Sequence, residues 1–264
     1  MSAVLHTPEL NRWEGAGLLP GAEVSVALAR GAAEVRESQR LRYEVFALES
    51  GAQLHSQEPG LDVDVYDRDC QHMLVRDAGG RLIASTRLLS SEDAAHDTGF
   101  YSQSEFIMDN ILRLPGRLLE VGRTCVHPEH RNGATLSRLW HGVGQFAREQ
   151  RVDWLFGCAS IPLNDGGAQA AVLLEQMRAR WSPAERRVYP LRPLICKDCA
   201  APMQAPLPPL LKAYLNMGAE VCGEAYWDAD FNVADVFVLI DTQRMSRRYA
   251  RRFYQAPAAA TGAA

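Results

Sequence analysis

The stretch from Leu118 to Gly133 constrains the fold more than any other part of the sequence. Its first half is a mostly apolar run that carries two charges, Glu120 and Arg123. Its second half contains a proline and a basic, glycine-containing loop, after which a helical pattern begins at Leu136. A strand, a loop and a helix N-terminus in this order place backbone N–H groups and the helix dipole where they hold a phosphate. The stretch therefore predicts an anion-binding loop with two charged side chains beside it.

Size, charge and hydropathy narrow the class of protein. A chain of 264 residues, 47% of them hydrophobic, can bury one large core. The net charge of -4 argues against nucleic-acid binding, which usually goes with a basic excess. No run of about 18 apolar residues occurs and the first residues lack a signal-peptide pattern, so we expect a cytoplasmic protein. We expect one domain over residues 21–243, between a loose lead-in at residues 1–20 and a basic helix with a disordered tail at residues 244–264.

Hydrophobic periodicity predicts a mixture of strands and helices. A glycine turn between two apolar runs predicts a hairpin, and two strands separated by a helix predict parallel pairing through a right-handed crossover. Residues 182–209 hold seven of the fourteen prolines, which predicts an extended surface arm or lid. The expected strands are Glu23–Arg30, His72–Asp77, Arg81–Leu89, Leu118–Val126, Val152–Ser160 and Ala234–Asp241, and the expected helices include Ala33–Leu48, Gly167–Arg180 and Pro209–Gly218.

Two stretches contain residue types that bind metals. Cys196 and Cys199 have the spacing of a zinc knuckle or a redox pair, but no second such pair accompanies them, so we expect no metal site. The stretch from Asp62 to Asp69 contains four aspartates without the glycine and glutamate spacing of an EF-hand. Three interpretations stay open for it: a solvated acidic loop, carboxylates paired with arginines, or a site for a cation or an ammonium group.

Several short motifs, weak singly and specific in combination, lie between residues 40 and 130. They are Leu41–Phe46, Asp64–Asp67, Ser85–Leu89, Phe100–Tyr101 with Glu105–Phe106, and Leu119–Val126. Together they resemble the GNAT acyltransferase superfamily, and more closely its branch of acyl-homoserine-lactone synthases and ornithine lipid N-acyltransferases. Three later motifs resemble the ornithine lipid N-acyltransferases rather than the lactone synthases, and they are Phe156–Pro162, Pro208–Ala219 and Trp227–Asp235.

The resemblance implies a fold and an acyl donor. The fold is α/β (α+β), GNAT-like, with a mixed, mainly antiparallel sheet, a central parallel strand pair and helices on both faces. The branch carries no permanently bound cofactor and generally takes its acyl group from the phosphopantetheine of acyl carrier protein, rather than from acyl-coenzyme A. The chain departs from the superfamily at residues 131–135, a short loop with one glycine where Gln/Arg-x-x-Gly-x-Gly/Ala is usual. This departure argues against tight binding of the coenzyme A pyrophosphate.

The implied chemistry assigns roles to charged residues of the motifs. Thioester-to-amine transfer needs a deprotonated amine and a stabilised oxyanion. We predict that Glu120, near Arg123, accepts or relays the amine proton; the alternative is a structural ion pair of Glu120 with Arg87 or Arg123. The predicted catalytic set is Glu120, Arg123, Asp64 and Asp67, of which the two aspartates bind the cationic acceptor. The predicted substrate-binding set is Arg42, Phe46, His72, Arg87 and Phe106, and the predicted phosphopantetheine-binding set is Val126, Arg131, Gly133, Ala134 and Thr135.

Within these sets, Arg42 and Arg87 orient the aspartates or grip the acceptor carboxylate. Phe46 and Phe106 wall an acyl channel. His72 is either catalytic or a packed or capping histidine.

The favoured function is transfer of a fatty or 3-hydroxy fatty acyl group to the α-amino group of ornithine or a similar amino acid, which forms a lyso-aminolipid. Two alternatives stay open: a lactone synthase that uses S-adenosylmethionine, and a non-catalytic module that binds carrier protein or membrane. The expected partners are acyl carrier protein and an amino acid, with no nucleic acid. The C-terminal basic helix suits a peripheral contact with an anionic membrane at its inner face. An acidic carrier protein needs a basic docking surface, for which the candidates are Arg131, Arg138, Arg148 and Arg151 or the C-terminal arginines.

Overall fold

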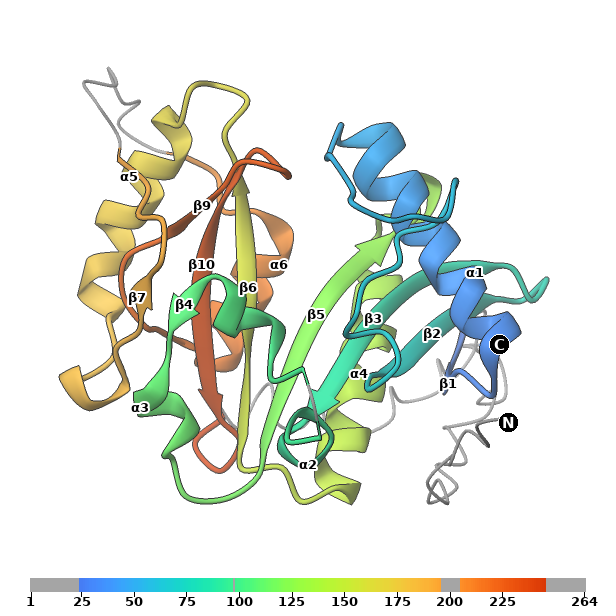
Figure 1. Cartoon of the computed structure of the whole chain (residues 1–264), viewed down its shortest axis with the longest axis horizontal. Helices are drawn as coiled ribbons and strands as arrows, with labels where there is room; N and C mark the ends of the chain where they lie inside the picture. Colours follow the sequence, from blue (N-terminus) through green and yellow to red (C-terminus); the bar gives the residue numbers. More distant parts are fainter. Residues whose placement is uncertain (1–23, 97, 196–204, 246–264) are drawn as a thin grey trace, which may run out of the picture.

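The structure, a computed structural model, describes residues 24–96, 98–195 and 205–245 (Figure 1). Its strands are β1 (Val24–Leu28), β2 (Gln71–Asp77), β3 (Leu82–Ser90), β4 (Phe106–Ile107), β5 (Leu118–Val126), β6 (Trp154–Pro162), β7 (Tyr189–Pro190), β8 (Glu220–Val221), β9 (Tyr226–Asp228) and β10 (Val233–Asp241). Its α-helices are α1 (Ala32–Tyr43), α2 (Ser91–Ala94), α3 (Asp109–Leu112), α4 (Gly133–Glu149), α5 (Ala168–Met177) and α6 (Pro209–Met217). Each of the six predicted strands corresponds to an observed strand, and the predicted helices correspond to α1, α5 and α6.

The main sheet has eight strands in the order β1-β2-β3-β5-β6-β10-β8, with β9 beside β10. All pairs are antiparallel except β5 and β6, which confirms the predicted hairpin of β2 and β3 and the predicted crossover through α4. The parallel pairing covers only residues 118–120 of β5 and residues 154–156 of β6. Beyond that point the two strands diverge, so that the sheet opens into two halves (Figure 1). The fold is therefore the expected mixed, mainly antiparallel sheet with one central parallel pair.

Helices cover both faces of the sheet. In the half that contains β1, β2, β3 and β5, α4 packs on one face and α1 lies across the other (Figure 1). Two separate groups of buried side chains reflect this arrangement: Val143 of α4 belongs to the main core with Met73 and Ile83, whereas Leu41 of α1 packs with Cys125. In the other half, α6 packs against β6 and β10, and α5 packs against β6. The apolar positions of β3 are buried on both faces because each face has its own helix.

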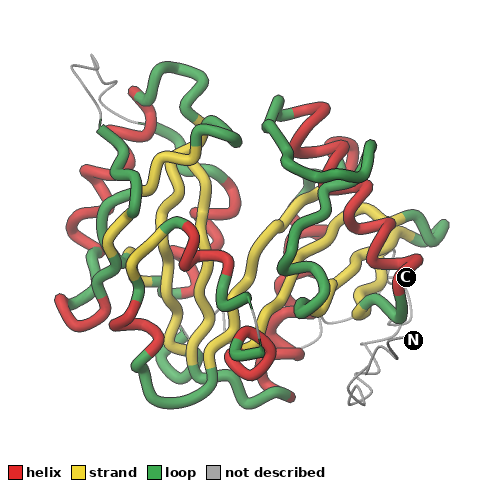
Figure 2. Tube along the Cα trace, viewed as in Figure 1, coloured by secondary structure: helices red, strands yellow, loops and turns green. Residues whose placement is uncertain are grey.

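Helix α1 does not stop at Tyr43 but continues as a π-helical segment, Glu44–Glu49. Its backbone includes a bond from the N–H of Ser50 to the carbonyl of Val45, five residues earlier. Such wide turns are rare and occur preferentially at functional sites. The long loop that follows, residues 50–70, returns beside α1 over the same face of the sheet (Figure 2). It carries the four aspartates of the acidic stretch back over the sheet.

Three predicted parts of the chain lie outside the described residues. They are the lead-in at residues 1–20, the basic C-terminal helix apart from its first two positions, and the pair Cys196 and Cys199. Part of the Pro-rich stretch is described: residues 182–195 run beside β8 and β9, where the N–H of Val188 donates to the carbonyl of Cys222. Across the described residues, none of the helices combines the length and the apolar character needed to cross a membrane.

Gly157 keeps β5 and β6 close one residue beyond their last parallel pair, where the strands begin to diverge. A Cβ atom at this position would overlap the backbone carbonyl oxygen of Val121, which cannot move without shifting β5. At Gly133, by contrast, a Cβ atom would meet nothing within 4 Å. The close approach of the two strands therefore depends on the absence of a side chain at Gly157.

We predict that Gly157→Ala destabilises the fold by about 1–3 kcal/mol, the usual cost of an overpacked core. Gly133→Ala, at the first position of α4, should leave the free energy of unfolding unchanged or raise it slightly, since alanine is the better helix former. Urea denaturation of the two variants measures the difference. Equal stabilities would show that the strand contact tolerates a methyl group and that the argument from close approach is wrong.

Candidate active site

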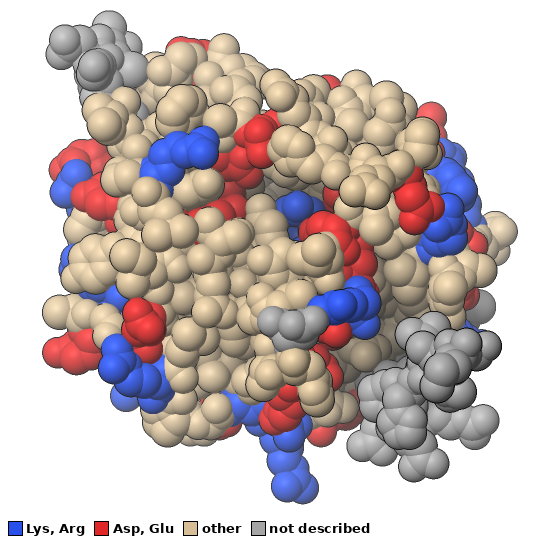
Figure 3. Space-filling view, viewed as in Figure 1, with Lys and Arg blue, Asp and Glu red and all other residues tan. Residues whose placement is uncertain are grey.

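A cavity lies where β5 and β6 diverge. It encloses about 630 Å³ including its open mouth. Figure 3 shows the corresponding hollow between the two halves of the molecule, with acidic atoms around it and basic atoms inside it. The lining residues come from α1's π-helical extension, the turn at residues 101–105, both diverging strands, α6 and the β9–β10 region: Phe46, Tyr101, Ser102, Glu105, Glu120, Val121, Gly122, Arg123, Thr124, Cys158, Ser160, Leu210, Asp228, Phe231 and Asp235.

A bulge in β5 brings Glu120 and Arg123 to the same cavity. Residues three apart on a regular strand point to opposite faces. Here Arg87 of β3 pairs with Gly122 and Ser85 pairs with Cys125, so that one residue of β3 faces two residues of β5, and Arg123 has a positive φ of 50°. This is the geometry of a β-bulge, which re-aims a side chain next to a functional site. Of the four residues predicted as catalytic, the two in β5, Glu120 and Arg123, therefore line the cavity.

The carboxylate of Glu120 is buried, with 4% of the residue exposed, and is held by three donors. The backbone N–H groups of Tyr101 and Ser102 each donate to it at 2.8 Å, and the Ser102 hydroxyl donates at 2.5 Å. Burial raises the pKa of Glu120 above its ordinary value, and the bonds from Ser102 and Tyr101 oppose the rise without cancelling it. A carboxylate with a raised pKa, fixed in place at the wall of a cavity, is suited to accept a proton. The ion pairs of the described residues do not join Glu120 to Arg87 or Arg123.

Arg42 is almost fully buried and is the centre of an ion network. It donates from Nε to Asp62 at 2.8 Å and from Nη1 and Nη2 to the two carboxylate oxygens of Asp67 at 2.8 and 2.9 Å. Burial alone would raise the pKa of Asp67, but the bonds and charge of Arg42 outweigh it, so that this pKa lies well below its ordinary value. Of the three interpretations of the acidic stretch, pairing with arginines is the one observed.

Arg87 and Arg123 extend the network toward the cavity. Arg87 contacts Asp64 at 2.5 Å and Asp67 at 3.1 Å. Arg123 lies 3.4 Å from Asp62 and 3.6 Å from Asp64, and its guanidinium stacks over the Tyr101 ring at 4.6 Å. Asp64 and Asp67 thus form ion pairs with arginines, and neither is among the residues that line the described cavity.

The other predicted substrate-binding residues divide into two groups. Phe46 lines the cavity, from the π-helical segment. Phe106 instead packs in an aromatic cluster with Phe237, ring centroids 5.6 Å apart. His72 is buried between the Ser38 hydroxyl and the carbonyl of Asp67, and burial lowers its pKa, so that it is neutral and acts here as a packed residue.

The loop between β5 and α4 has the predicted strand–loop–helix geometry, but Asn132 occupies part of it. Its side-chain oxygen accepts hydrogen bonds from the N–H groups of Ala134 and Thr135, at 3.0 and 2.9 Å, as an N-cap. Arg131 forms a bidentate pair with Glu49, both bonds 2.6 Å. Two amides and one arginine that we predicted to bind phosphopantetheine therefore have partners within the chain.

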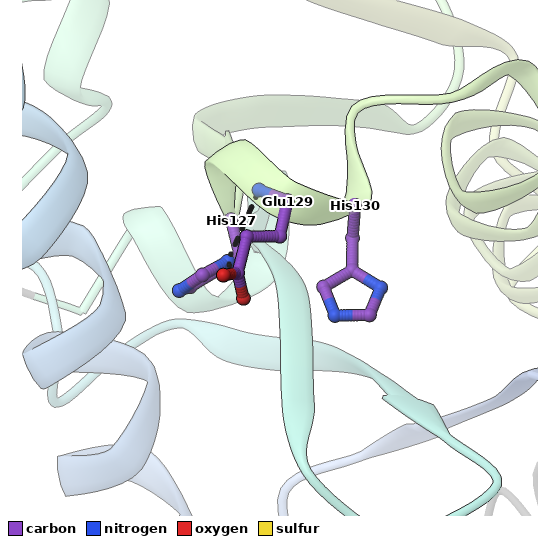
Figure 4. Close-up of side chains that lie close together, drawn as sticks. All are labelled: His127, Glu129 and His130. Atoms are coloured by element: carbon purple, nitrogen blue, oxygen red, sulfur yellow. Dashed lines mark hydrogen bonds and ion pairs between the residues drawn. The ribbon is translucent and has the colours of Figure 1, made fainter.

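A histidine cluster sits in the same loop. His127, Glu129 and His130 place potential ligand atoms within 4.8 Å of one another (Figure 4). The Nε2 atom of His127 faces a guanidinium nitrogen of Arg81 at 2.8 Å, and its Nδ1 atom faces the N–H of Glu129. A neutral imidazole accepts a hydrogen bond at only one ring nitrogen, so one of these two donors bonds to His127 and the other lies beside the ring, which makes His127 part of a hydrogen-bonded turn.

Three carboxylates that line the cavity were not predicted as site residues from the sequence. Glu105, Asp228 and Asp235 come from three separate segments, and their carboxylate oxygens lie within 4.8 Å of one another. Both Glu105 and Asp235 fall in motifs that carried the resemblance, but only the folded sheet shows that they meet. Cys158, between them and Glu120, also lines the cavity, and burial raises its pKa well above the ordinary value, which keeps the thiol protonated and unsuited to nucleophilic attack.

Comparison with known proteins adds independent findings. The family model described as Acetyltransferase (GNAT) domain matches residues 41–141. The L-ornithine N(alpha)-acyltransferase of Rhodobacter capsulatus is 36% identical over 87% of this chain and 93% of its own length. The enzyme of the same name from Rhizobium meliloti is also 36% identical, over 86% of this chain and 83% of its own length. Among solved structures, the N-acyl amino acid synthase FeeM from uncultured soil microbes is 11% identical, with a TM-score of 0.49 over 84% of this chain and 92% of that one.

We predict that Asp67→Asn lowers the free energy of unfolding by about 3–5 kcal/mol at pH 7, because it removes one of the two counter-charges of the buried Arg42 and also a partner of Arg87. The folded-state pKa of Asp67 lies below that of the unfolded chain, so this contribution is complete above about pH 4 and declines as the pH falls further. Denaturant titrations of the parent protein and the variant at pH 7, 5 and 3.5 measure this contribution to the free energy of unfolding.

Glu58→Gln is the matched control for that titration. It removes the carboxylate of an exposed pair with Arg36 and should cost less than about 1 kcal/mol. If Asp67→Asn lowers the free energy of unfolding by no more than Glu58→Gln does, the proposed importance of the buried ion network is contradicted.

Proposed function

The chain belongs to the GNAT acyltransferases and, within them, to the family of the L-ornithine N(alpha)-acyltransferases, and on this basis we propose that it transfers a fatty acyl group from a thioester to the α-amino group of ornithine. That it is an acyltransferase follows from the family. Ornithine as the acceptor is supported by the names of relatives that are 34–36% identical over more than four fifths of this chain. The product would be an N-acylornithine, a lyso-aminolipid.

The observation that carries the proposal is the buried, hydrogen-bonded carboxylate of Glu120 in the wall of the cavity. An amino acid arrives as an ammonium ion and must lose a proton before its nitrogen can attack a thioester carbon. Glu120 takes that proton, directly or through water. The nitrogen then forms a bond to the thioester carbon, and the oxyanion that results faces the guanidinium of Arg123.

Collapse of the oxyanion breaks the carbon–sulfur bond and leaves a thiolate that needs a proton. The attacking nitrogen still carries one proton too many. Tyr101 lines the same cavity, and its hydroxyl, kept protonated because burial raises its pKa well above the ordinary value, relays that proton from the nitrogen to the thiolate. The protonated Cys158 takes no part as a nucleophile, which agrees with direct transfer without an acyl-enzyme. The network of Asp62, Asp64 and Asp67 acts by positioning Arg87 and Arg123.

For the donor, we propose acyl carrier protein rather than acyl-coenzyme A. Asn132 already accepts from two N–H groups at the start of α4, which leaves less of the helix N-terminus for a pyrophosphate than for the single phosphate of a carrier-bound pantetheine. Docking of an acidic carrier also requires exposed basic groups, and the arginines predicted for this role include Arg148 in the last turn of α4 and Arg151 just after the helix.

Mass spectrometry of the products tests the proposal. Purified protein is incubated with acylated carrier protein, or with the same acyl group on coenzyme A, together with a panel of ornithine, lysine, glycine and glutamine. N-acylornithine formed from carrier protein, at a rate that falls steeply with added salt, is the expected result. A lactone from S-adenosylmethionine, or no product with any pair, would contradict it.

We predict that Glu120→Gln lowers kcat by about 10²- to 10⁴-fold, the usual contribution of a general base. In the unchanged protein, kcat/KM should fall on the acid side with an apparent pKa above the ordinary glutamate value, because Glu120 must be deprotonated to act and burial raises its pKa. Near-normal turnover of Glu120→Gln would remove this residue from the mechanism.

Ser102→Ala separates a catalytic Glu120 from a merely structural one. Loss of the 2.5 Å bond raises the pKa of Glu120 further, so the acid limb of the pH profile should move to higher pH while turnover at alkaline pH persists. Ser104→Ala, in the same turn, removes an exposed bond to the Tyr101 carbonyl and should leave the limb in place. An acid limb that stays unchanged in Ser102→Ala would show that it does not report on Glu120.

A further inference from the structure

The three carboxylates of Glu105, Asp228 and Asp235 form a compact acidic cluster in the cavity. Asp228 ends β9, Asp235 lies in β10, and Glu105 follows the turn that holds Glu120. The exposed fractions of the three residues are 3% for Glu105, 9% for Asp228 and 4% for Asp235. Their side chains and that of Glu120 line one continuous cavity.

The cluster lacks the arginines that neutralise the other buried carboxylates. Asp235 accepts from the Ser160 hydroxyl at 2.6 Å, and Asp228 accepts from the N–H groups of Asp230 and Phe231 at 2.9 and 3.0 Å. These neutral donors orient the carboxylates without supplying a charge. Among the ion pairs of the described residues, none includes a member of the cluster.

Glu105 shows most clearly that a partner is missing within the chain. The carboxyl group has neutral hydrogen-bonding neighbours in Tyr101 and Cys158, but its buried Oε2 atom has no partner among the described residues, although the side chain lines the cavity. A buried polar atom without a partner is costly, and three carboxylates in contact repel one another. Burial, reinforced by Asp235, raises the pKa of Glu105, and burial raises the pKa of Asp235 to about 6. A cation entering the cluster would relieve both costs.

We propose that Glu105, Asp228 and Asp235 bind the side-chain ammonium group of the amino-acid acceptor, an assignment that rests on the function proposed above. An ammonium group has three N–H donors, which match three carboxylates converging on one point. The three methylenes of ornithine would span the cavity between this cluster and the α-amine at Glu120. Phe46 and Phe231, in edge-to-face contact at 5.6 Å, line the same cavity and provide apolar surface for the methylenes.

This assignment replaces the earlier expectation that Asp64 and Asp67 bind the acceptor. Those two carboxylates are neutralised by Arg42 and Arg87, so a further cation would gain little there. At the cluster, where the charge of Arg123 offsets that of Asp235 only in part, a cation gains both electrostatic attraction and hydrogen bonds. The site would also reject neutral side chains, because binding them leaves buried carboxylates unpaired.

Norvaline is the matched probe, since it has the carbon skeleton of ornithine without the side-chain ammonium group. Calorimetric titration of the full chain should give binding of ornithine at least about 100-fold tighter than that of norvaline. Glu105→Gln and Asp235→Asn should each weaken ornithine binding by at least about 10-fold and leave norvaline binding unchanged or stronger. In turnover assays the same loss should appear mainly in KM for ornithine.

Asp230→Asn is the control, because it removes a nearby carboxylate that pairs with His55 at the surface. Its binding of ornithine should equal that of the unchanged protein. Glu105→Gln and Asp235→Asn both relieve repulsion within the cluster, so their thermal unfolding midpoints should equal or exceed that of the parent protein. If one of the two variants fails to fold, the other still tests the subsite.

Equal losses for ornithine and norvaline, or ornithine binding that survives both variants, would overturn the subsite. Ornithine binding abolished by a chelator would also overturn it, since the cluster would then hold a divalent metal. If binding follows the prediction but no N-acylornithine forms, the subsite stands and the proposed function fails.

Discussion

The site depends on the neutralisation of three arginines that the fold places out of water. Arg42, Arg87 and Arg123 come from α1, β3 and β5, and the loop at residues 61–70 supplies their aspartates. A buried guanidinium without a counter-charge costs several kcal/mol, so the helix, the loop and the two strands are held in one arrangement. That arrangement fixes the bulge of β5. Through the bulge it fixes the direction of Arg123 toward the cavity.

The buried carboxylates of this protein therefore fall into three kinds with different physical roles. Asp62 and Asp67 form ion pairs with arginines and have a structural role. Glu120 is held by hydrogen-bond donors alone, which leaves it able to exchange a proton with a substrate. Glu105 and its neighbours have too few donors for their charge, so a cationic ligand completes them. Acidic residues next to one another in space thus perform different chemistry because their partners differ.

The sequence predicts the framework well and the site only in part. Apolar runs and the Leu118–Gly133 stretch specify the strands, the hairpin and the parallel crossover, because these follow from local pattern and chain order. The charges of Glu120 and Arg123 are visible for the same reason. The bulge that brings them to one cavity depends on the pairing of β5 with β3. The cluster of Glu105, Asp228 and Asp235 depends on strands that are distant in sequence, so the spacing of residues along the chain predicts neither feature. The capping role of Asn132 is a local signal, since Asn before a helical pattern is a favoured N-cap.

The most direct test of this account is a crystal structure of the protein with N-acylornithine bound. The account predicts that the amide nitrogen lies within hydrogen-bond reach of the Glu120 carboxylate, at about 2.6–3.2 Å or through one water, with the acyl group leaving the cavity between β5 and β6. A product bound outside this cavity, or one whose amide nitrogen is remote from Glu120, would contradict it.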